Sequence, residues 1–143
     1  MMGSSPHIIY RNDLAGIDWS ALKAALAADD FDNGRSREQL RDSFSNSHAV
    51  CIAWHEGEIM GMARVLSDGV CNAYLVDVWT KSSFCRRGIA REMVEQLVGG
   101  LPGQHIYLQA DRNNAEFYSK LGFAEQPVGM SRISGKWLVN KRD

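Results

Sequence analysis

The chain has 143 residues and is 45% hydrophobic, which is enough for one domain with its own core and too little for two. Lysine and arginine number 16 against 17 aspartate and glutamate residues, so no overall basic field favours nucleic-acid binding. We expect a single domain over residues 1–143, in which any anion site is local.

The three cysteines, Cys51, Cys71 and Cys85, lie far apart and form no CxxC pair. This pattern favours a reducing compartment without a disulfide framework, and we expect no metal site. The N-terminal stretch MMGSSPHIIY lacks the basic and apolar regions of a secretion signal, and no segment approaches about 18 uninterrupted apolar residues. We therefore expect a cytoplasmic protein that does not bind a membrane.

Two helices are predicted in the first third of the chain, after a short strand at residues 7–11. Asp18 can cap the first helix, which carries apolar residues on one face. Ser36 and Gln39 have the spacing of a capping box at the start of the second helix. The polar stretch ADDFDNGR connects the two helices.

The middle third changes to the period of strands. Residues 49–69 alternate in polarity around an EG turn, which predicts a β-hairpin, and a further strand follows at residues 71–80. Next come a helix that begins with Gly-Ile-Ala at residue 88, a strand at residues 105–111 and a helix at residues 114–121. Strands at residues 123–133 and 137–140 complete the expected mixed α/β sheet, which has helices on its faces.

The stretch SFCRRGIAREMVEQL places Arg86 and Arg87 directly before Gly88, where a helix begins. The first N–H groups of a helix have no internal partner and carry partial positive charge, so they suit a phosphate. Gly88 would let the phosphate approach the backbone. A surface helix that happens to begin with Arg-Arg-Gly remains an alternative, because short glycine patterns are weak signals.

Asp77 lies in the middle of the apolar strand NAYLVDVWT. Strand alternation predicts that Asp77 shares one side with Leu75 and Trp79. A buried carboxylate costs free energy unless it has partners or faces a wet cleft. Asp77 is therefore either paired with an arginine or a backbone turn, or it lines a substrate site.

Tyr118 belongs to a third feature, the stretch DRNNAEFYSKLGF. Its ring can be part of the core, and for this residue alone we favour that interpretation. A tyrosine hydroxyl still needs a partner, however, and it could point into a cleft beside the phosphate helix.

Taken together, these features resemble the GNAT superfamily of acyl-CoA N-acyltransferases. The stretch from Cys85 to Ala90 is similar to the family's Q/R-x-x-G-x-G/A signature. Downstream, the stretch NAEFYSKLGF is similar to its second motif through Asn114, Ala115, Tyr118, Gly122 and Phe123. Cys85 departs from the pattern, because glutamine or arginine is usual at that position. The resemblance implies a six- to seven-stranded, mostly antiparallel sheet with a V-shaped splay between the strand that ends near Thr80 and the strand that starts near His105.

The resemblance also implies acetyl-CoA as cosubstrate. Pantetheine would pair with the backbone of Val78 and Thr80, and an N–H near Val78 or Trp79 would stabilise the oxyanion. The expected contacts of the rest of the cofactor are Arg86, Arg87, Gly88, Ile89, Ala90, Arg91 and Asn114. Tyr118 stands at the family's usual position for the proton donor to the thiolate, and Asp77 is our candidate for the base.

The expected reaction is acetyl transfer to a primary amine of a small molecule or peptide, by direct attack in a ternary complex. The alternative is a non-catalytic acyl-CoA-binding or sensing domain, against which an intact Tyr118 argues. Asp29, Asp30 and Asp32 could attract a cationic amine, although a solvated acidic loop is the simpler interpretation. The exposed final strands could pair two chains in a homodimer.

Overall fold

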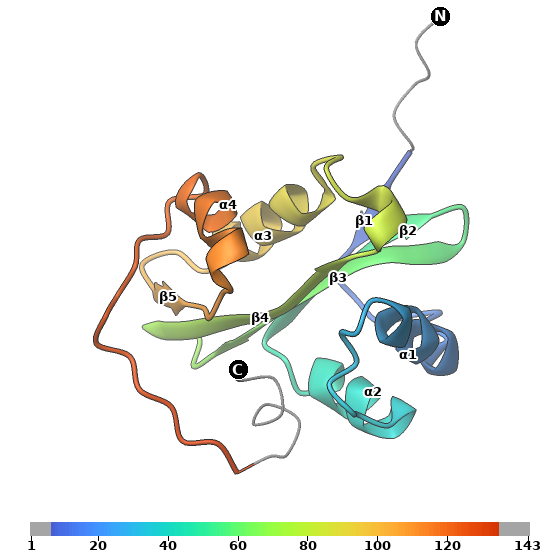
Figure 1. Cartoon of the computed structure of the whole chain (residues 1–143), viewed down its shortest axis with the longest axis horizontal. Coiled ribbons are helices and arrows are strands. Elements are labelled where there is room, and N and C mark those ends of the chain that lie inside the picture. The colour runs from blue at the N-terminus through green and yellow to red at the C-terminus, as the bar shows by residue number, and fades with distance from the viewer. Residues whose placement is uncertain (1–6, 135–143) are drawn as a thin grey trace, which may run out of the picture.

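The computed structural model describes residues 7–134 and shows helices on both faces of one sheet (Figure 1). The strand order is β1-β2-β3-β4-β5. The elements are β1 (Ile9–Arg11), α1 (Trp19–Ala28), α2 (Arg37–Ser45), β2 (Ala49–His55), β3 (Glu58–Ser67), β4 (Asn72–Thr80), η1 (Ser82–Phe84), α3 (Ile89–Gly99), β5 (His105–Tyr107), η2 (Arg112–Asn114) and α4 (Ala115–Ser119).

Both predicted caps in the first third of the chain are confirmed. Asp18 Oδ1 accepts a hydrogen bond from the N–H of Ala21 at 3.0 Å. Ser36 Oγ accepts from the N–H of Gln39 at 3.1 Å, and Gln39 Oε1 accepts in return from the N–H of Ser36 at 2.9 Å. Side chains therefore satisfy N–H groups that each helix leaves unpaired at its start.

The predicted hairpin is β2 and β3, which pair antiparallel. Glu56 and Gly57 at its turn have φ of 49° and 78°, and positive φ at both central residues matches the right-handed twist of the strands. β1–β2 and β3–β4 also pair antiparallel, whereas β4 and β5 run parallel. The expected mixed, mostly antiparallel sheet is therefore confirmed.

The expected number of strands is wrong for the part of the chain that the structure describes, where the sheet has five strands. No strand forms at residues 123–133. Pro127 lacks an N–H for pairing, and Val128 and Met130 are 80% and 97% exposed. The strand expected at residues 137–140 lies outside the described residues.

The two faces of the sheet have separate hydrophobic cores. α3 covers one face, where it buries Ile89, Met93, Val94 and Leu97 against β2, β3 and β4. α1 and α2 cover the other face through Leu22, Leu26, Leu40 and Phe44. The sheet thereby separates a side that carries α3 and α4 from a side that carries α1 and α2 (Figure 1).

A β-bulge at Asp77 interrupts the alternation of β4. Arg64 and Met62 of β3 pair with Val76 and Trp79, so β4 carries one extra residue between these pairs. Asp77 itself has φ of 57°. Leu75 consequently packs on the α3 face, whereas Trp79 packs among α1 and α2. The predicted grouping of Leu75 with Asp77 and Trp79 on one side is wrong, because a bulge shifts the side-chain period.

Candidate functional site

A cleft opens beside β4, beyond its pairing with β5. The two strands pair only from Asn72 to Tyr74. Beyond that point lies a cavity of about 380 Å³, lined by residues 74–78, residues 108–111, Phe31, Asn114 and Tyr118. The cavity lies where the splay was expected, but β5 pairs with β4 over its whole length and the chain leaves β4 only after Tyr107. We call this cavity the cleft.

The backbone of β4 presents a free edge beyond the bulge. The N–H of Lys81 donates to the carbonyl of Met60 at 2.8 Å. Hydrogen-bonding groups alternate along an antiparallel strand, so the backbone of Trp79 also faces β3, whereas Val78 and Thr80 face away from it. Of the two candidates for an oxyanion donor, Val78 and Trp79, only Val78 directs its N–H away from β3.

The side chain of Thr80 is a second feature of this edge. Its Oγ1 is buried and has no hydrogen-bond partner within the described residues. Buried polar atoms are nearly always paired in folded proteins. Because this oxygen has almost no accessible surface, a ligand lying along Val78 and Thr80 could pair with it only after the Thr80 side chain turns.

The start of α3 is an uncapped helix N-terminus. Gly88 is its N-cap residue with φ of 80°, and no side chain bonds to the first N–H groups. A Cβ atom added to Gly88 would meet nothing within 4 Å, so the space over these donors is open. Ile89 is buried and anchors the turn, which leaves the backbone N–H groups of Ile89, Ala90 and Arg91 for an anion.

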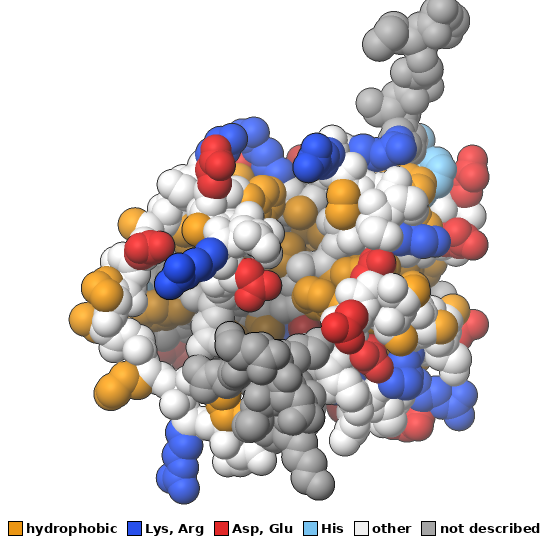
Figure 2. All heavy atoms as spheres, viewed as in Figure 1, with side chains coloured by type: hydrophobic (Ala, Val, Ile, Leu, Met, Phe, Trp, Pro, Cys, Tyr) orange, Lys and Arg blue, Asp and Glu red, His pale blue; other side chains and the backbone are white. Residues whose placement is uncertain are grey.

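The arginines around this turn have different surroundings. Figure 2 shows Lys and Arg side chains along the edge of the molecule that carries α3 and the loop before it. Arg86 is exposed, whereas the guanidinium of Arg87 lies 5.0 Å from the ring centroid of Phe84. Arg91 pairs with Glu95 at 3.2 Å. Arg86 and Arg87 can therefore add positive charge to the backbone donors, while the Arg91 side chain is already paired.

Cys85, which departs from the family signature, turns toward the end of β4. Its Sγ lies 3.7 Å from the carbonyl oxygen of Thr80 and 3.6 Å from that of Lys81. The thiol thus faces the turn rather than the anion donors, which come from the backbone. The substitution removes a polar side chain and leaves the helix N-terminus intact.

Tyr118 reaches the cleft from the short helix α4. Its ring packs edge-on against Phe117 and Phe123, at centroid distances of 4.9 and 5.8 Å. The hydroxyl makes no hydrogen bond within the described part of the chain, and the residue lines the cleft. Burial raises the pKa of Tyr118 above its ordinary value, so the phenol stays protonated at neutral pH. The core and cleft interpretations of Tyr118 therefore both hold.

Asn114 lies beside Tyr118 at the start of α4. It is the N-cap residue of that helix, but its side chain makes no capping hydrogen bond. The residue also lines the cleft. Its position at the cleft is compatible with the predicted contact to a cofactor, which stays a prediction.

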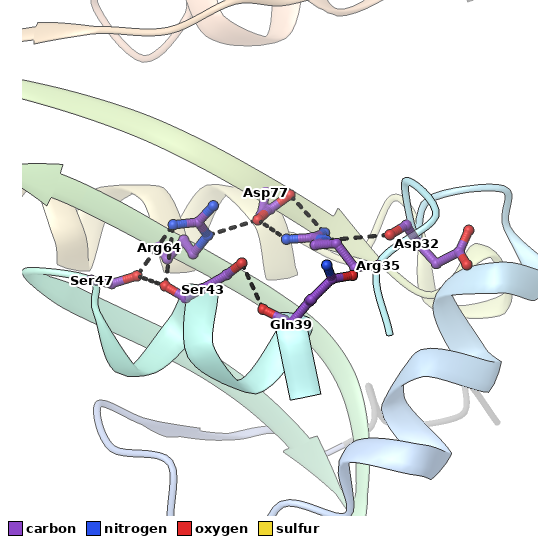
Figure 3. Close-up of polar contacts among 7 residues, drawn as sticks. All are labelled: Asp32, Arg35, Gln39, Ser43, Ser47, Arg64 and Asp77. Carbon is purple, nitrogen blue, oxygen red and sulfur yellow. Dashed lines mark hydrogen bonds and ion pairs between the residues drawn. The ribbon is translucent and has the colours of Figure 1, made fainter. Parts of the chain in front are cut away.

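Asp77 forms a buried ion triad with two arginines (Figure 3). Arg35 donates two hydrogen bonds to the carboxylate, at 2.8 and 3.2 Å, and Arg64 Nε donates a third at 2.7 Å. The Asp77 side chain is only 4% exposed. Of the two alternatives for Asp77, pairing with arginine is the one observed, although the residue also lines the cleft.

The triad argues against Asp77 as the general base. Burial alone would raise the pKa of Asp77, but the hydrogen bonds and charges of Arg35 and Arg64 outweigh this effect and lower the pKa below its ordinary value. A carboxylate with three charge-assisted hydrogen bonds is a poor proton acceptor at neutral pH. We therefore withdraw the assignment of Asp77 as base.

Arg35 and Arg64 are the residues that the sequence analysis missed. Arg64 interrupts the apolar strand β3 as Asp77 interrupts β4, and opposite charges inside neighbouring buried strands predict a pair. The sequence alone could therefore have predicted that Arg64 pairs with Asp77. Arg35 follows a polar loop in which nothing local distinguishes it from a solvated side chain.

Two carboxylates of the acidic loop between α1 and α2, those of Asp29 and Asp32, bond to other groups of the chain. Asp29 Oδ2 accepts from the indole N–H of Trp79 at 2.9 Å and from the N–H of Ser82 at 3.1 Å. Asp32 pairs with Lys23 at 3.1 Å. Phe31, not these carboxylates, lines the cleft. Neither Asp29 nor Asp32 is therefore placed to attract a cationic amine.

Residues 7–134 carry no candidate metal cluster and no membrane-spanning helix. No group of three or more His, Cys, Asp or Glu side chains is arranged to hold a metal ion there. No helix in the same range has the length and apolar character needed to span a bilayer.

Comparison with known proteins identifies the family. A sequence profile described as the acetyltransferase (GNAT) family matches residues 14–123. GCN5-related N-acetyltransferase 1, chloroplastic, from Arabidopsis thaliana is 27% identical over 141 residues, which cover 94% of this chain and 68% of the relative. GCN5-related N-acetyltransferase 2, chloroplastic, from the same plant is 36% identical over 78 residues, which cover 52% of this chain and 30% of the relative.

Solved structures share the fold. An acetyltransferase of the GNAT family from Xanthomonas campestris superimposes with a TM-score of 0.78 at 20% identity, covering 91% of this chain and 95% of that chain. An acetyltransferase from Clostridium acetobutylicum, whose structure is described as with acetyl-CoA, has a TM-score of 0.69 at 20% identity and covers 96% and 100%. These likenesses support the fold. The profile match over residues 14–123 confirms the acyltransferase class expected from the sequence, and the chain belongs to the acetyltransferase (GNAT) family.

Proposed function

We propose that the chain transfers an acetyl group from acetyl-CoA to a primary amine of a small molecule or peptide, by direct attack in a ternary complex. The observation that supports this proposal is the nearness of two features: the start of α3 and the loop before it lie beside the end of β4, where Cys85 Sγ is 3.7 Å from the carbonyl oxygen of Thr80. The uncapped N-terminus of α3 offers donors for a pyrophosphate. The free edge of β4 at Val78 and Thr80 offers backbone groups for an extended pantetheine.

The residues present fit acetyl-CoA, which supplies a thioester whose carbonyl carbon the amine attacks. The N–H groups of residues 88–91 would hold the pyrophosphate, with Arg86 and Arg87 adding charge. Asn114 lines the same cleft and would contact the cofactor from α4. Donors on a helix N-terminus are already oriented, so little ordering is needed on binding.

Two groups of this chain would serve the transfer step. The N–H of Val78 lies on the cleft side of the bulge and would donate to the oxygen that gains negative charge. The hydroxyl of Tyr118 would donate its proton to the departing thiolate, and its raised pKa keeps that proton available at neutral pH. With Asp77 bound to two arginines, we assign removal of the amine proton to water in the cleft.

Thiol release from acetyl-CoA tests the proposal against a panel of polyamines, arylalkylamines, amino acids, aminoglycosides and N-terminal peptides. We expect at least one class to release CoA thiol in proportion to the amount of protein. Acetyl-CoA should also raise the melting temperature, because a ligand at about a hundredfold excess over its Kd stabilises by about 2.7 kcal/mol. Binding without thiol release for any amine would favour the acyl-CoA-binding alternative, and no binding at millimolar acetyl-CoA would contradict the proposal.

Domain organisation, location and assembly are proposals as well. We keep one catalytic domain, a cytoplasmic location and a homodimer as expectations, although two relatives from Arabidopsis thaliana are named chloroplastic. Cell fractionation tests the location. Sedimentation of the purified chain tests the homodimer, and a monomer at micromolar concentration would contradict it.

A further inference from the structure

The triad of Arg35, Asp77 and Arg64 joins three separate segments of the chain. We infer that it is a positioning device, which fixes residues 29–35 between α1 and α2 against the bulge of β4 and so sets how the site accepts its amine. Residues 29–35 are called the acceptor wall below. The inference rests on the proposed function in one respect, namely that the amine enters along this wall.

The backbone at Asp77 needs support from its side chain. Its φ of 57° lies in the left-handed region, which costs free energy for a residue other than glycine. Glycine would relieve this cost but would lack a carboxylate. Asp77 adopts this left-handed conformation, and both of its carboxylate oxygens accept hydrogen bonds from Arg35 and Arg64. The bulge next to the Val78 N–H is therefore tied to two arginines.

Arg35 connects the bulge to the acceptor wall. Its Nη1 and Nη2 donate to Asp77, while its Nε donates to the carbonyl of Asp32 at 3.2 Å. The carbonyl of Arg35 accepts from Lys23 Nζ, which also bonds Asp32 Oδ2 at 3.1 Å. The Arg35 side chain is only 11% exposed. One guanidinium thus holds the wall backbone and the strand together with little access for water.

The other end of the acceptor wall is anchored independently. Asp29 accepts from the indole N–H of Trp79 and from the N–H of Ser82. Phe31 lies between the two anchors and lines the cleft, and its N–H donates to the carbonyl of Leu26 at 2.8 Å. We expect its place in the cleft to depend on both anchors. Loss of the Arg35 guanidinium would weaken one of them, although the bonds from Lys23 to Asp32 and to the backbone carbonyl of residue 35 would remain.

Arg64 connects the triad to α2. Its Nη1 donates to the carbonyl of Ser43 at 3.3 Å, and its guanidinium lies 5.6 Å from the ring centroid of Phe44. Arg64 therefore fixes the bulge to α2, whereas Arg35 fixes the bulge to the acceptor wall. Substitutions of Arg35 and Asp77 should consequently have different effects.

Hydrogen exchange of Arg35→Gln tests the inference without reference to catalysis. Arg41→Gln is the matched control, because Arg41 is exposed on α2 and, among residues 7–134, forms an ion pair only with its neighbour Asp42. We expect faster exchange over residues 29–35 in Arg35→Gln and unchanged exchange over β2 and α3, while Arg41→Gln matches the wild type. Unchanged exchange over the acceptor wall in Arg35→Gln would overturn the inference.

Kinetics with the best amine of the panel supply the second readout. For Arg35→Gln we expect KM for the amine to rise about tenfold, since small misplacement of a binding wall suffices for a change of this size. The Kd of acetyl-CoA should stay unchanged, because the donors at the start of α3 lie outside the triad. An unchanged KM for the amine, or an equal loss for amine and acetyl-CoA, would contradict the positioning role.

Asp77→Asn separates positioning from proton transfer. We expect faster exchange over both residues 29–35 and residues 77–79, together with a lower kcat. The shape of the pH–rate profile should not change, because Asp77 carries no proton in the reaction. Loss of the acidic limb in Asp77→Asn would restore Asp77 as the base and overturn the inference. If Asp77→Asn does not fold, Arg35→Lys, which keeps the charge and loses the paired hydrogen bonds, carries the exchange test.

The two proposals fail in distinguishable ways. If wild-type protein neither binds acetyl-CoA nor releases thiol, the proposed function is wrong, yet the exchange result for Arg35→Gln still tests the link between the wall and the strand. If wild-type protein is active and exchange over residues 29–35 does not respond to Arg35→Gln, only the inference is wrong.

Discussion

The two sides of the cleft are built in different ways. On the proposed donor side, consecutive residues supply the site: Gly88 opens α3, and its uncapped backbone N–H groups would bind the ligand. On the acceptor side, charged side chains from the α1–α2 connection, β3 and β4 meet only after folding. The donor side therefore needs a local conformation, whereas the acceptor side needs long-range contacts to form.

This difference has a consequence for specificity. Backbone donors can recognise a pyrophosphate without requiring particular side chains, so we expect the donor side to bind with Cys85 in place of the usual glutamine or arginine. The acceptor wall consists of side chains held by other side chains. Acceptor specificity can therefore change through residues such as Arg35 that do not line the cleft themselves.

The largest expected effect comes from Tyr118→Phe, which removes one hydroxyl from the donor side and almost no volume. Loss of the general acid should lower kcat by roughly 10²–10⁴-fold, while the Kd of acetyl-CoA barely moves. Because the pKa of Tyr118 is raised, the wild-type rate should decline only at pH above about 10, and the variant should lack that decline. Steady-state kinetics across pH, with Tyr107→Phe as control, measure both effects. Wild-type turnover in the variant would assign the proton to solvent.

Asp77→Asn should cause the next largest effect, this time on the acceptor side. It leaves two guanidiniums without their counter-charge, which costs about 3–5 kcal/mol of unfolding free energy for a buried pair. Asp42→Asn is the control, because its carboxylate is 62% exposed and its pair with Arg41 contributes at most about 1 kcal/mol. Urea titration measures both values, and equal losses would show that the triad contributes no special stability.

The same variant makes a prediction for pH. The folded pKa of Asp77 is lowered, so its carboxylate stabilises the fold above the unfolded pKa of about 3.9. This stabilisation is lost as pH falls through the lower, folded pKa. The difference in unfolding free energy between wild type and Asp77→Asn should therefore be constant near neutral pH and shrink in acid. A difference that grows in acid would mean that the folded pKa is raised.

Gly88→Val tests the donor side. Valine at φ of 80° is strained, at a cost of about 1–2 kcal/mol, and its side chain would occupy the space over the helix N-terminus. Gly103→Val is the matched control, because Gly103 has φ of 75° with similarly open space but follows the C-terminal end of α3, away from the proposed phosphate donors. Calorimetry should show similar losses of stability but an affinity for CoA at least about tenfold weaker in Gly88→Val only. Equal affinities would place the phosphate elsewhere.

Arg87→Ala should have the smallest effect. The side chain of Arg87 is exposed and stacks on Phe84, so its charge is worth at most about 1 kcal/mol, or roughly fivefold in CoA affinity. This contribution should shrink as salt is added, because exposed charges are screened. Arg41→Ala serves as the control in CoA titrations at low and high salt. A loss far above fivefold would mean that side chains, rather than the backbone, dominate phosphate binding.

The same contrast explains what could be predicted from the sequence. The caps at Asp18 and Ser36, the hairpin, α3 and the place of the cleft beside β4 follow from local patterns or from the family motifs. Residues 123–133 were wrongly predicted as a strand, because a strand also needs an edge to pair with and Pro127 weakens that pairing. The bulge at Asp77 was not predicted, because the alternation of side chains along a strand assumes that no residue is inserted. Arg35 escaped because its partner lies 42 residues away.

Titration of acetyl-CoA into isotopically labelled protein, followed by amide NMR, tests the central claim most directly. The claim is that the start of α3 and the free edge of β4 bind one acetyl-CoA molecule together. We predict that the amides of Val78, Thr80 and residues 88–91 shift along one binding curve, while residues 37–45 of α2 do not respond. Shifts confined to another surface, or none at millimolar acetyl-CoA, would contradict the claim.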